Sequence, residues 1–378
     1  MTETETETPP RLHDVVVIGA GAAGIGVAIT LGHAEVPDVV LLDRNNVASS
    51  FDAWPAETRF ITPSFPTNSV GMLDLNAVAI GTSPAITTGS EHPTGGEYAS
   101  YLRRLAEFFE LLVVHETDVT SVTKIDDEFH LDTSRGWLRT KHVVWAAGEF
   151  QYPRLQGISG ADHCRHTATV DRYADLDGDD IIIIGGYESG VDAAYHLAGQ
   201  GKRVRLFDSG CPWKDTSSDP SIALSTYSHE RMQHPHFVER VELHPDTAIA
   251  SVTHEDGTYR VTSAHGRTFE TTAQPLYAGG FEGGHSLVAH LFEEREDGYP
   301  LLSEDDESTI TPGLFLCGPA VRHGTQSFCF IYKYRQRFAV VAKAIATSLG
   351  LEAEQLEAYR MWGMYLDDLS VCGEDCVC

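Results

Sequence analysis

Short apolar runs alternate with stretches of helical periodicity along most of this chain. The runs lie at residues 15–18, 39–42 and 181–184, and a further strand is expected at 203–207. Continuous runs of this length are typical of parallel strands that are buried on both faces of a sheet. Apolar residues recur at helical spacing in the stretches 96–110 and 334–349. The alternation predicts an α/β fold.

The first two apolar runs flank a glycine-rich turn. Gly19, Gly21 and Gly24 follow the first run, and Asp43 ends the second. The first glycine permits a tight turn, the second lets a pyrophosphate approach the backbone, and the third lets helix and strand pack closely. A helix N-terminus offers unpaired N–H groups to phosphates, and an acid about twenty residues further on can accept from ribose hydroxyls. The pattern predicts a dinucleotide-binding unit.

A second copy of the pattern begins about 165 residues later. Gly185 and Gly190 hold the outer glycine positions, and Asp208 ends the following strand. Tyr187 stands where the middle glycine is expected, and its side chain extends toward the space of a pyrophosphate. The second unit is therefore a candidate for NADH or NADPH, and Tyr187 argues against its being occupied.

The order of the units predicts a domain inserted into another domain. Residues 11–165 and 275–350 form the first dinucleotide-binding domain in this prediction, and residues 166–274 form the second. Residues 1–10, a Thr-Glu repeat with two prolines, are expected to be a disordered leader. Residues 351–378 are expected to form a C-terminal helix and a cysteine-rich tail.

The net charge and the lengths of the apolar runs exclude some classes of binding partner. The 378 residues carry a formal net charge of −28, which argues against nucleic acid and anionic membranes as partners. No apolar run is long enough to span a bilayer and no secretory signal stands at the N-terminus, so we expect a cytoplasmic protein. Only 6 of the 27 cationic residues are lysine. This acidic, lysine-poor surface is typical of proteins from salt-loving organisms, and an ordinary acidic enzyme is the equal alternative.

Three of the seven cysteines, Cys372, Cys376 and Cys378, lie in the last seven residues. Closely spaced thiols on a tail can carry electrons as a redox shuttle; a zinc or other soft-metal clip and an inert terminus are the alternatives. Cys329 is a candidate internal thiol. Cys317 is expected in the core, Cys164 and Cys211 have no expected role, and we name no metal ligands elsewhere.

These motifs resemble the flavoproteins with two dinucleotide-binding domains, a superfamily that includes thioredoxin reductases, bacillithiol disulfide reductase-like proteins and flavin-containing monooxygenases. The resemblance covers about residues 12–350 and includes the segments 143–148 and 313–318. It implies FAD in the first unit and a nicotinamide nucleotide in the second. The cofactor-binding residues that it implies are Gly19, Ala20, Gly21, Ala22, Ala23, Gly24, Asp43, Arg44, Trp54, Val119, Ala147, Gly148, Gly318, Pro319 and Gln336, with Gly185, Gly190 and Asp208 in the second unit.

The resemblance also implies finer features, and the chain departs from it in others. Arg335 and Gln336 would open a helix aimed at the flavin pyrimidine, and His166 and His323 are candidates for proton transfer. The core has no Cys-x-x-Cys, so the thioredoxin reductase dithiol is missing. The monooxygenase signature Phe-x-Gly-x-x-x-His before the second unit is also not met.

The hypothesis that follows is an FAD-dependent oxidoreductase. It would perform thiol–disulfide exchange through the flavin and the terminal cysteines on a small-molecule or protein disulfide, and the resemblance implies a homodimer. A flavin-dependent monooxygenase of a small N or S nucleophile is one alternative. A non-enzymatic flavin redox or metal-binding protein is the other.

Overall fold

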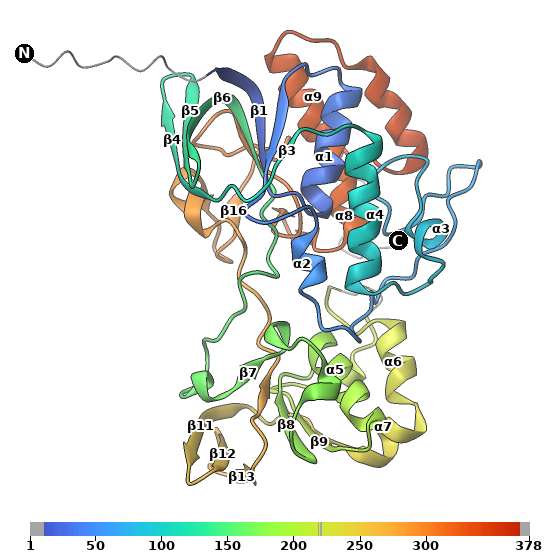
Figure 1. Cartoon of the computed structure of the whole chain (residues 1–378), viewed down its shortest axis with the longest axis vertical. Coiled ribbons are helices and arrows are strands. Elements are labelled where there is room, and N and C mark those ends of the chain that lie inside the picture. Colours follow the sequence, from blue (N-terminus) through green and yellow to red (C-terminus); the bar gives the residue numbers. More distant parts are fainter. Residues whose placement is uncertain (1–10, 218, 220, 371–378) are drawn as a thin grey trace, which may run out of the picture.

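The computed structural model describes residues 11–217, 219 and 221–370, which form two domains, one above the other in Figure 1. The upper domain contains both ends of the described chain, and the lower domain is inserted into it. None of the helices in this described part is long and apolar enough to cross a bilayer.

The core of the first domain is a seven-stranded sheet in the order β3-β2-β1-β6-β5-β4, with β17 beside the end of β6. Val15, Val16 and Val17 of β1 are fully buried although successive side chains point to opposite faces, so both faces of this strand are covered. The strands are β1 Leu12–Ile18, β2 Val39–Leu42, β3 Val113–Val114, β4 Val119–Ile125, β5 Glu128–Thr133, β6 Gly136–Trp145 and β17 Leu314–Leu316.

Helices α1, α4 and α9 gather on one side of this sheet (Figure 1). A Cβ atom at Gly26 of α1 would lie 2.1 Å from the ring of Phe338 in α9, so a glycine is needed where these helices meet. Thr94 and Glu97 form a capping box at the start of α4. The helices of this domain are α1 Ala22–His33, α2 Ser49–Asp52, α3 Pro84–Thr88, α4 Gly95–Phe108, α8 Ile331–Tyr334 and α9 Phe338–Ser348.

The second domain repeats the plan on a smaller scale. Its five-stranded sheet is parallel throughout, in the order β10-β9-β8-β14-β7, and the antiparallel sheet β11-β12-β13 lies beside it. The strands are β7 Arg165–His166, β8 Asp180–Ile184, β9 Arg203–Phe207, β10 Val241–His244, β11 Ile249–Glu255, β12 Thr258–Ser263, β13 Thr268–Thr271 and β14 Leu276–Tyr277. The helices are α5 Glu188–Gly199, α6 Thr226–Met232 and α7 Pro235–Arg240.

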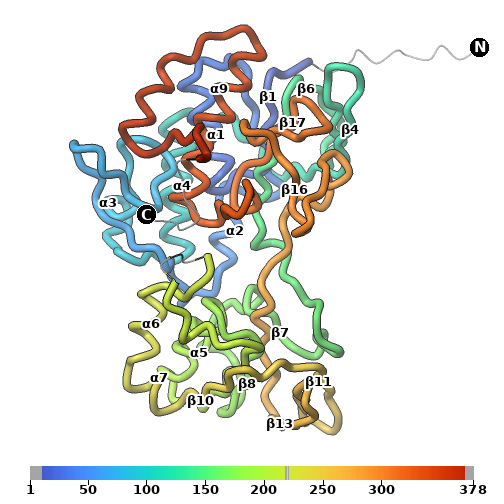
Figure 2. The backbone as a smooth tube through the Cα atoms, turned by 180° about the vertical axis from the view of Figure 1, so that it is seen from behind, coloured from blue at the N-terminus to red at the C-terminus, as the bar shows by residue number. Residues whose placement is uncertain are grey.

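Two segments that are far apart in sequence connect the domains side by side (Figure 2). Pro153 and Phe281 form an antiparallel bridge between them. The Arg154 N–H donates to the Gly280 carbonyl at 3.0 Å.

The smaller elements are two-stranded ribbons and 3-10 helices. The ribbons are β15 Glu293–Glu294 with β16 Pro300–Leu301, and β18 Arg322–His323 with β19 Gln326–Ser327. The 3-10 helices are Ala161–His163, Thr167–Thr169, Tyr173–Asp175, Pro212–Lys214, Ser286–Leu291, Arg335–Arg337 and Glu354–Trp362.

The α/β fold class is confirmed, and two details of the prediction are wrong. The chain returns to the first sheet only after β14, because this strand completes the second sheet; residue 275 is therefore too early as a boundary. The helical run that was expected to open at Arg335 begins at Ile331. The helix expected in the segment after Leu351 is the 3-10 helix Glu354–Trp362, and its buried Leu356 belongs to the first core.

Candidate functional site

The first glycine turn connects β1 to α1 at the carboxyl end of the sheet. Gly19 has φ +102°, a conformation that L side chains rarely adopt. A Cβ atom at Gly24 would lie 1.8 Å from the Gly19 carbonyl oxygen, so this glycine lets helix and strand touch. A Cβ atom at Gly21 would meet nothing within 4 Å, so Gly21 leaves open space above the turn. The three glycines therefore have three different physical roles.

Asp43 closes the turn from the end of β2. Its Oδ2 accepts the Ala20 N–H at 2.8 Å, and its Oδ1 accepts the Asn45 N–H at 2.8 Å. These bonds hold the carboxylate at the edge of a cavity of about 430 Å³ that the turn borders. The cavity extends from this turn to the contact between the domains, where Glu188, Ser189 and Asp192 of the second domain also line it.

The cavity brings together most of the residues predicted for the first cofactor. Lining it are Gly19, Gly21, Ala22, Ala23, Asp43, Arg44, Trp54, Val119, Ala147, Gly148 and Pro319. Cys329, predicted as an internal thiol, lines the cavity as well. Ala20 and Gly24 lie behind this surface as parts of the turn. A Cβ atom at Gly318 would lie 3.3 Å from the Cβ of Ala23, so Gly318 supports the wall from behind.

Gln336 and its neighbour Arg335 do not line the cavity, because the helical run starts one turn earlier. Arg335 is buried and donates to the carbonyl oxygens of Asp74 and Ala77, which anchors the segment 51–95. Gln336 Nε2 donates to the Tyr332 carbonyl within its own helix at 2.9 Å. The residues at the cavity are instead Phe330 and Ile331, at the N-terminus of α8.

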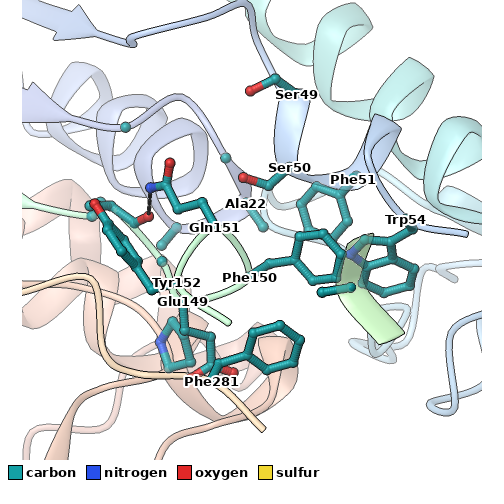
Figure 3. A pocket seen from close by; sticks show the side chains of 18 of the residues that line it. Ala22, Ser49, Ser50, Phe51, Trp54, Glu149, Phe150, Gln151, Tyr152 and Phe281 are labelled. Carbon is teal, nitrogen blue, oxygen red and sulfur yellow. Dashed lines mark hydrogen bonds between the residues drawn. The ribbon is translucent and has the colours of Figure 1, made fainter. Parts of the chain in front are cut away.

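Aromatic side chains form one wall of the cavity (Figure 3). The ring centroids of Phe51 and Trp54 are 5.4 Å apart, and those of Trp54 and Phe60 are 4.9 Å apart. Phe150 lies 6.1 Å from Trp54 and 5.3 Å from Phe281, so the wall continues onto the connecting segments between the domains. This end of the cavity is suited to a flat apolar ring system.

Glu149 places a carboxyl group in the same cavity, directly after Gly148 (Figure 3). Burial raises the pKa of Glu149, and the nearby Arg322 guanidinium lowers it in part. Its carboxyl has no hydrogen-bond partner among the described residues. The side chain therefore places a buried carboxyl group with a raised pKa at the cavity.

Cys329 is the cysteine of the described part that lines the cavity, one residue before the N-cap of α8. It is half-buried, and its Sγ lies 3.1 Å from the hydroxyl oxygen of Ser221 in the second domain. Lys333 Nζ binds the same hydroxyl at 2.9 Å and Asp219 at 2.8 Å. The thiol therefore lies at a contact between the two domains.

Three further hydrogen bonds connect the domains near the cavity. The Glu57 carboxylate accepts the N–H groups of Tyr173 at 3.0 Å and Ala174 at 3.2 Å. The Thr58 hydroxyl donates to Asp192 Oδ2 at 2.6 Å.

The remaining predicted cysteines and histidines do not meet in the cavity. Burial raises the pKa of Cys164 to about 12, and it also raises the pKa of Cys317. Both ring nitrogens of His166 bond to backbone groups, and His323 Nε2 bonds to the buried Asp306 carboxylate at 2.5 Å. Neither histidine lines the cavity, and their role in proton transfer stays a prediction. Cys211 is partly exposed elsewhere, and Cys372, Cys376 and Cys378 lie outside the described residues.

The second glycine turn holds side chains of the chain itself. The Asp208 carboxylate accepts the Gly186 N–H at 2.7 Å, which repeats the bond between Asp43 and Ala20. The Trp213 Nε1–H donates to the Gly186 carbonyl at 2.8 Å. The predicted residues Gly185, Gly190 and Asp208 are not among those that line the cavity, and neither are Tyr187 and Trp213.

A comparison with protein families relates this arrangement to known proteins. The model of the pyridine nucleotide-disulphide oxidoreductase family matches residues 16–318, which include both glycine turns and well over half of the chain. The chain belongs to this family. The members of this family are flavin-dependent oxidoreductases, which favours the enzymatic hypotheses over the non-enzymatic alternative.

Individual relatives agree with this family. Bacilliredoxin reductase Bdr of Bacillus subtilis is 24% identical over 339 residues, which are 88% of this chain and 97% of that protein. The uncharacterized oxidoreductase CzcO of Bacillus velezensis is 29% identical over 193 residues, 50% of this chain and 52% of the relative, so the chain spans about half the length of the CzcO proteins that it matches. The structure of bacillithiol disulfide reductase Bdr from Staphylococcus aureus shares the fold, with a TM-score of 0.72, 17% identity, and coverage of 89% of this chain and 99% of that one.

The pyridine nucleotide-disulphide oxidoreductases are FAD-binding enzymes, and the first domain of this chain fits that cofactor. Gly21 leaves open space at the N-terminus of α1, where a pyrophosphate would be stabilised by free N–H groups. Asp43 stands at the edge of the cavity, and the aromatic wall at the other end suits a flavin ring. The same pocket thus offers a polar end and a flat apolar end.

The sequence analysis missed three residues that line the cavity and one that covers the second glycine turn. Glu149 follows the predicted Gly148 directly, so its position alone is a usable signal. Phe150 and Phe281 become neighbours only because the connecting segments are paired. Trp213 lies 27 residues from Gly186, and no local pattern relates the two.

Proposed function

We propose that the chain is an FAD-dependent thiol–disulfide oxidoreductase that uses Cys329 at the cavity and the terminal cysteines as exchanging thiols. The observation that carries this proposal is a hydrogen bond between Leu369, near the end of the described chain, and the segment that carries Cys329. Gln326 Nε2 donates to the Leu369 carbonyl oxygen at 3.1 Å, and Gln326 precedes Cys329 by three residues. The last described residues therefore lie next to the segment that carries Cys329.

Chain length supports contact between the two sets of thiols. An extended chain spans at most about 3.6 Å per residue, so the seven residues from Leu369 to Cys376 reach about 25 Å. The three residues from Gln326 to Cys329 span at most about 11 Å. The tail is thus long enough to bring Cys376 to Cys329.

The proposed exchange reduces one substrate disulfide with two protein thiols, which become a protein disulfide. The Cys329 thiolate attacks one sulfur of the substrate disulfide, which breaks that S–S bond, forms a mixed disulfide and releases half of the substrate as a thiolate. A terminal thiolate such as that of Cys376 then attacks Cys329 Sγ, releases the other half and leaves a protein disulfide. FAD, when bound, supplies the two-electron carrier that returns this disulfide to thiols, with electrons from an external dithiol or a reduced iron–sulfur protein.

The relatives support the choice of reaction. The B. subtilis relative that aligns over 88% of this chain is named a bacilliredoxin reductase, and the S. aureus structure is named a bacillithiol disulfide reductase. We extend this chemistry to the present chain, with a small-molecule or protein disulfide as substrate, a homodimer as the assembly and the cytoplasm as the location.

The test measures oxidation of the reduced enzyme by a disulfide. FAD-loaded protein is reduced anaerobically with one equivalent of dithionite and mixed with 5,5′-dithiobis(2-nitrobenzoate), and the return of the yellow flavin absorbance is followed. Cys329→Ser should slow this return at least about 100-fold. Cys211→Ser is the matched control, because Cys211 is partly exposed and does not line the cavity. The triple variant Cys372→Ser, Cys376→Ser and Cys378→Ser should stop turnover after the mixed disulfide.

A wild-type rate in Cys329→Ser with FAD still bound would overturn the role of this thiol. A wild-type rate in the triple variant would overturn the role of the tail. Oxygen-dependent incorporation of an oxygen atom into an amine or thioether would instead support the flavin-dependent monooxygenase.

A further inference from the structure

The two glycine turns have nearly the same backbone. Gly19 and Gly185 have φ values of +102° and +103°. The middle positions match as well, with φ −87° and ψ −164° at Gly21, and φ −86° and ψ −163° at Tyr187. The comparison is therefore between two turns of the same shape, and any difference in what they bind lies in their side chains.

The supporting contacts of the two turns also match. A Cβ atom at Gly24 would lie 1.8 Å from the Gly19 carbonyl oxygen, and one at Gly190 would lie 1.9 Å from the Gly185 carbonyl oxygen. An aspartate at the end of the next strand accepts an N–H of the turn in both units. The second unit has thus kept the architecture of a nucleotide site.

The space above the second turn is filled by the chain itself. Trp213 bonds through its indole N–H to the Gly186 carbonyl, and its Cζ2 is only 2.5 Å from where a Cβ atom of Gly186 would be. The indole ring therefore lies directly against the turn. The Tyr187 hydroxyl donates to the Ala223 carbonyl at 2.7 Å, which holds this side chain under the segment that follows Trp213. At Gly21 of the first turn the corresponding space is open.

A carboxylate stands at the N-terminus of the following helix. Glu188 is the first residue of α5, and its Oε1 accepts the Ser225 N–H at 2.5 Å while its Oε2 accepts the Ser228 hydroxyl at 2.5 Å. The first turn of α1 carries no acidic residue. A pyrophosphate at α5 would meet this negative charge in addition to the indole ring.

We propose that Tyr187 and Trp213 close the second glycine turn, so that this enzyme binds neither NADH nor NADPH there. The family's usual nucleotide does not fit these residues, and the second domain serves as a scaffold. Described residues of the chain between β9 and α6 contact both this turn and the first domain. Trp213 and Ala223 cover the turn, while Ser221 touches Cys329 of the first domain. The enzyme's electrons then enter by a route that does not use this turn.

The test is nucleotide binding, which is independent of disulfide turnover and of the role of Cys329. The FAD-loaded wild type is titrated with NADH and with NADPH by isothermal titration calorimetry, up to about 1 mM, the upper end of ordinary KM values. The double variant Tyr187→Gly, Trp213→Ala is titrated in the same way. Trp137→Ala is the matched control, because Trp137 is an exposed tryptophan on β6 of the first domain.

The wild type and the Trp137→Ala control should show no saturable binding, and the double variant should gain it, at least about tenfold tighter than the wild-type limit. Circular dichroism and the retained flavin absorbance show that the double variant is folded. Saturable wild-type binding of NADH or NADPH within this range, up to about 1 mM, would overturn the proposal. A folded double variant that binds no nucleotide would overturn the assignment of the closure to these two side chains.

Discussion

Two glycines of the first turn, three residues apart, should respond differently to the same substitution: alanine should destabilise the fold at Gly24 but not at Gly21. Gly24→Ala would put a methyl group 1.8 Å from a backbone oxygen, so α1 must move away from β1. Overpacking of this kind costs about 1–3 kcal/mol. Gly21→Ala meets nothing within 4 Å, and its φ of −87° is open to any residue, so the cofactor-free stability should change by less than about 0.5 kcal/mol.

The affinity for FAD, in contrast, should depend on Gly21. In Gly21→Ala the methyl group enters the space where a pyrophosphate approaches the backbone, so the affinity for FAD should fall at least about tenfold, or 1.4 kcal/mol. Gly21→Tyr copies the second turn of the chain and should abolish FAD binding while the domain still folds.

Two measurements separate these effects. Differential scanning fluorimetry of the cofactor-free proteins should show Gly24→Ala melting about 2–12 °C below the wild type and Gly21→Ala close to it. Titration of FAD fluorescence then gives the Kd of each variant that folds. Wild-type affinity in Gly21→Tyr would refute the placement of FAD at this turn. An unchanged melting temperature in Gly24→Ala would refute the packing argument.

Three further predictions concern buried charges and the contact between the domains. Glu149→Gln should raise the melting temperature at neutral pH. Burial raises the pKa of this carboxyl, so the folded wild type loses stability as pH rises through that pKa, and the glutamine does not. A difference in melting temperature that stays constant between about pH 4.5 and 8 would contradict this. Asp306→Asn should lower the free energy of unfolding in urea by about 3–5 kcal/mol, because Arg337, which is 1% exposed, would lose its buried counter-charge. A decrease below about 1 kcal/mol would contradict this. Glu57→Gln should weaken the docking of the domains and speed proteolysis of the two connecting segments, and an unchanged cleavage rate would count against this role.

Local signals predicted the scaffold of the site well. The strand, glycine turn, helix and acidic end of the first unit all appear as expected, because each depends on residues within about thirty positions of one another. The start of the helix at Ile331 was missed because the contacts of this segment are with residues far away in the sequence. Arg335 looks like a cofactor residue in sequence, but its guanidinium is buried against the carbonyl oxygens of Asp74 and Ala77, some 260 residues away.

The difference between the two turns shows where sequence reasoning ends for this protein. Glycine spacing dictates backbone shape, and that shape is local, so both turns could be recognised from the amino acids alone. Whether a turn is open depends on what the rest of the chain places above it. Tyr187 hinted at a closed turn, but Trp213 reaches Gly186 only through the folded path between β9 and α6. Likewise, the position of Cys329 against the second domain exists only once the domains are docked.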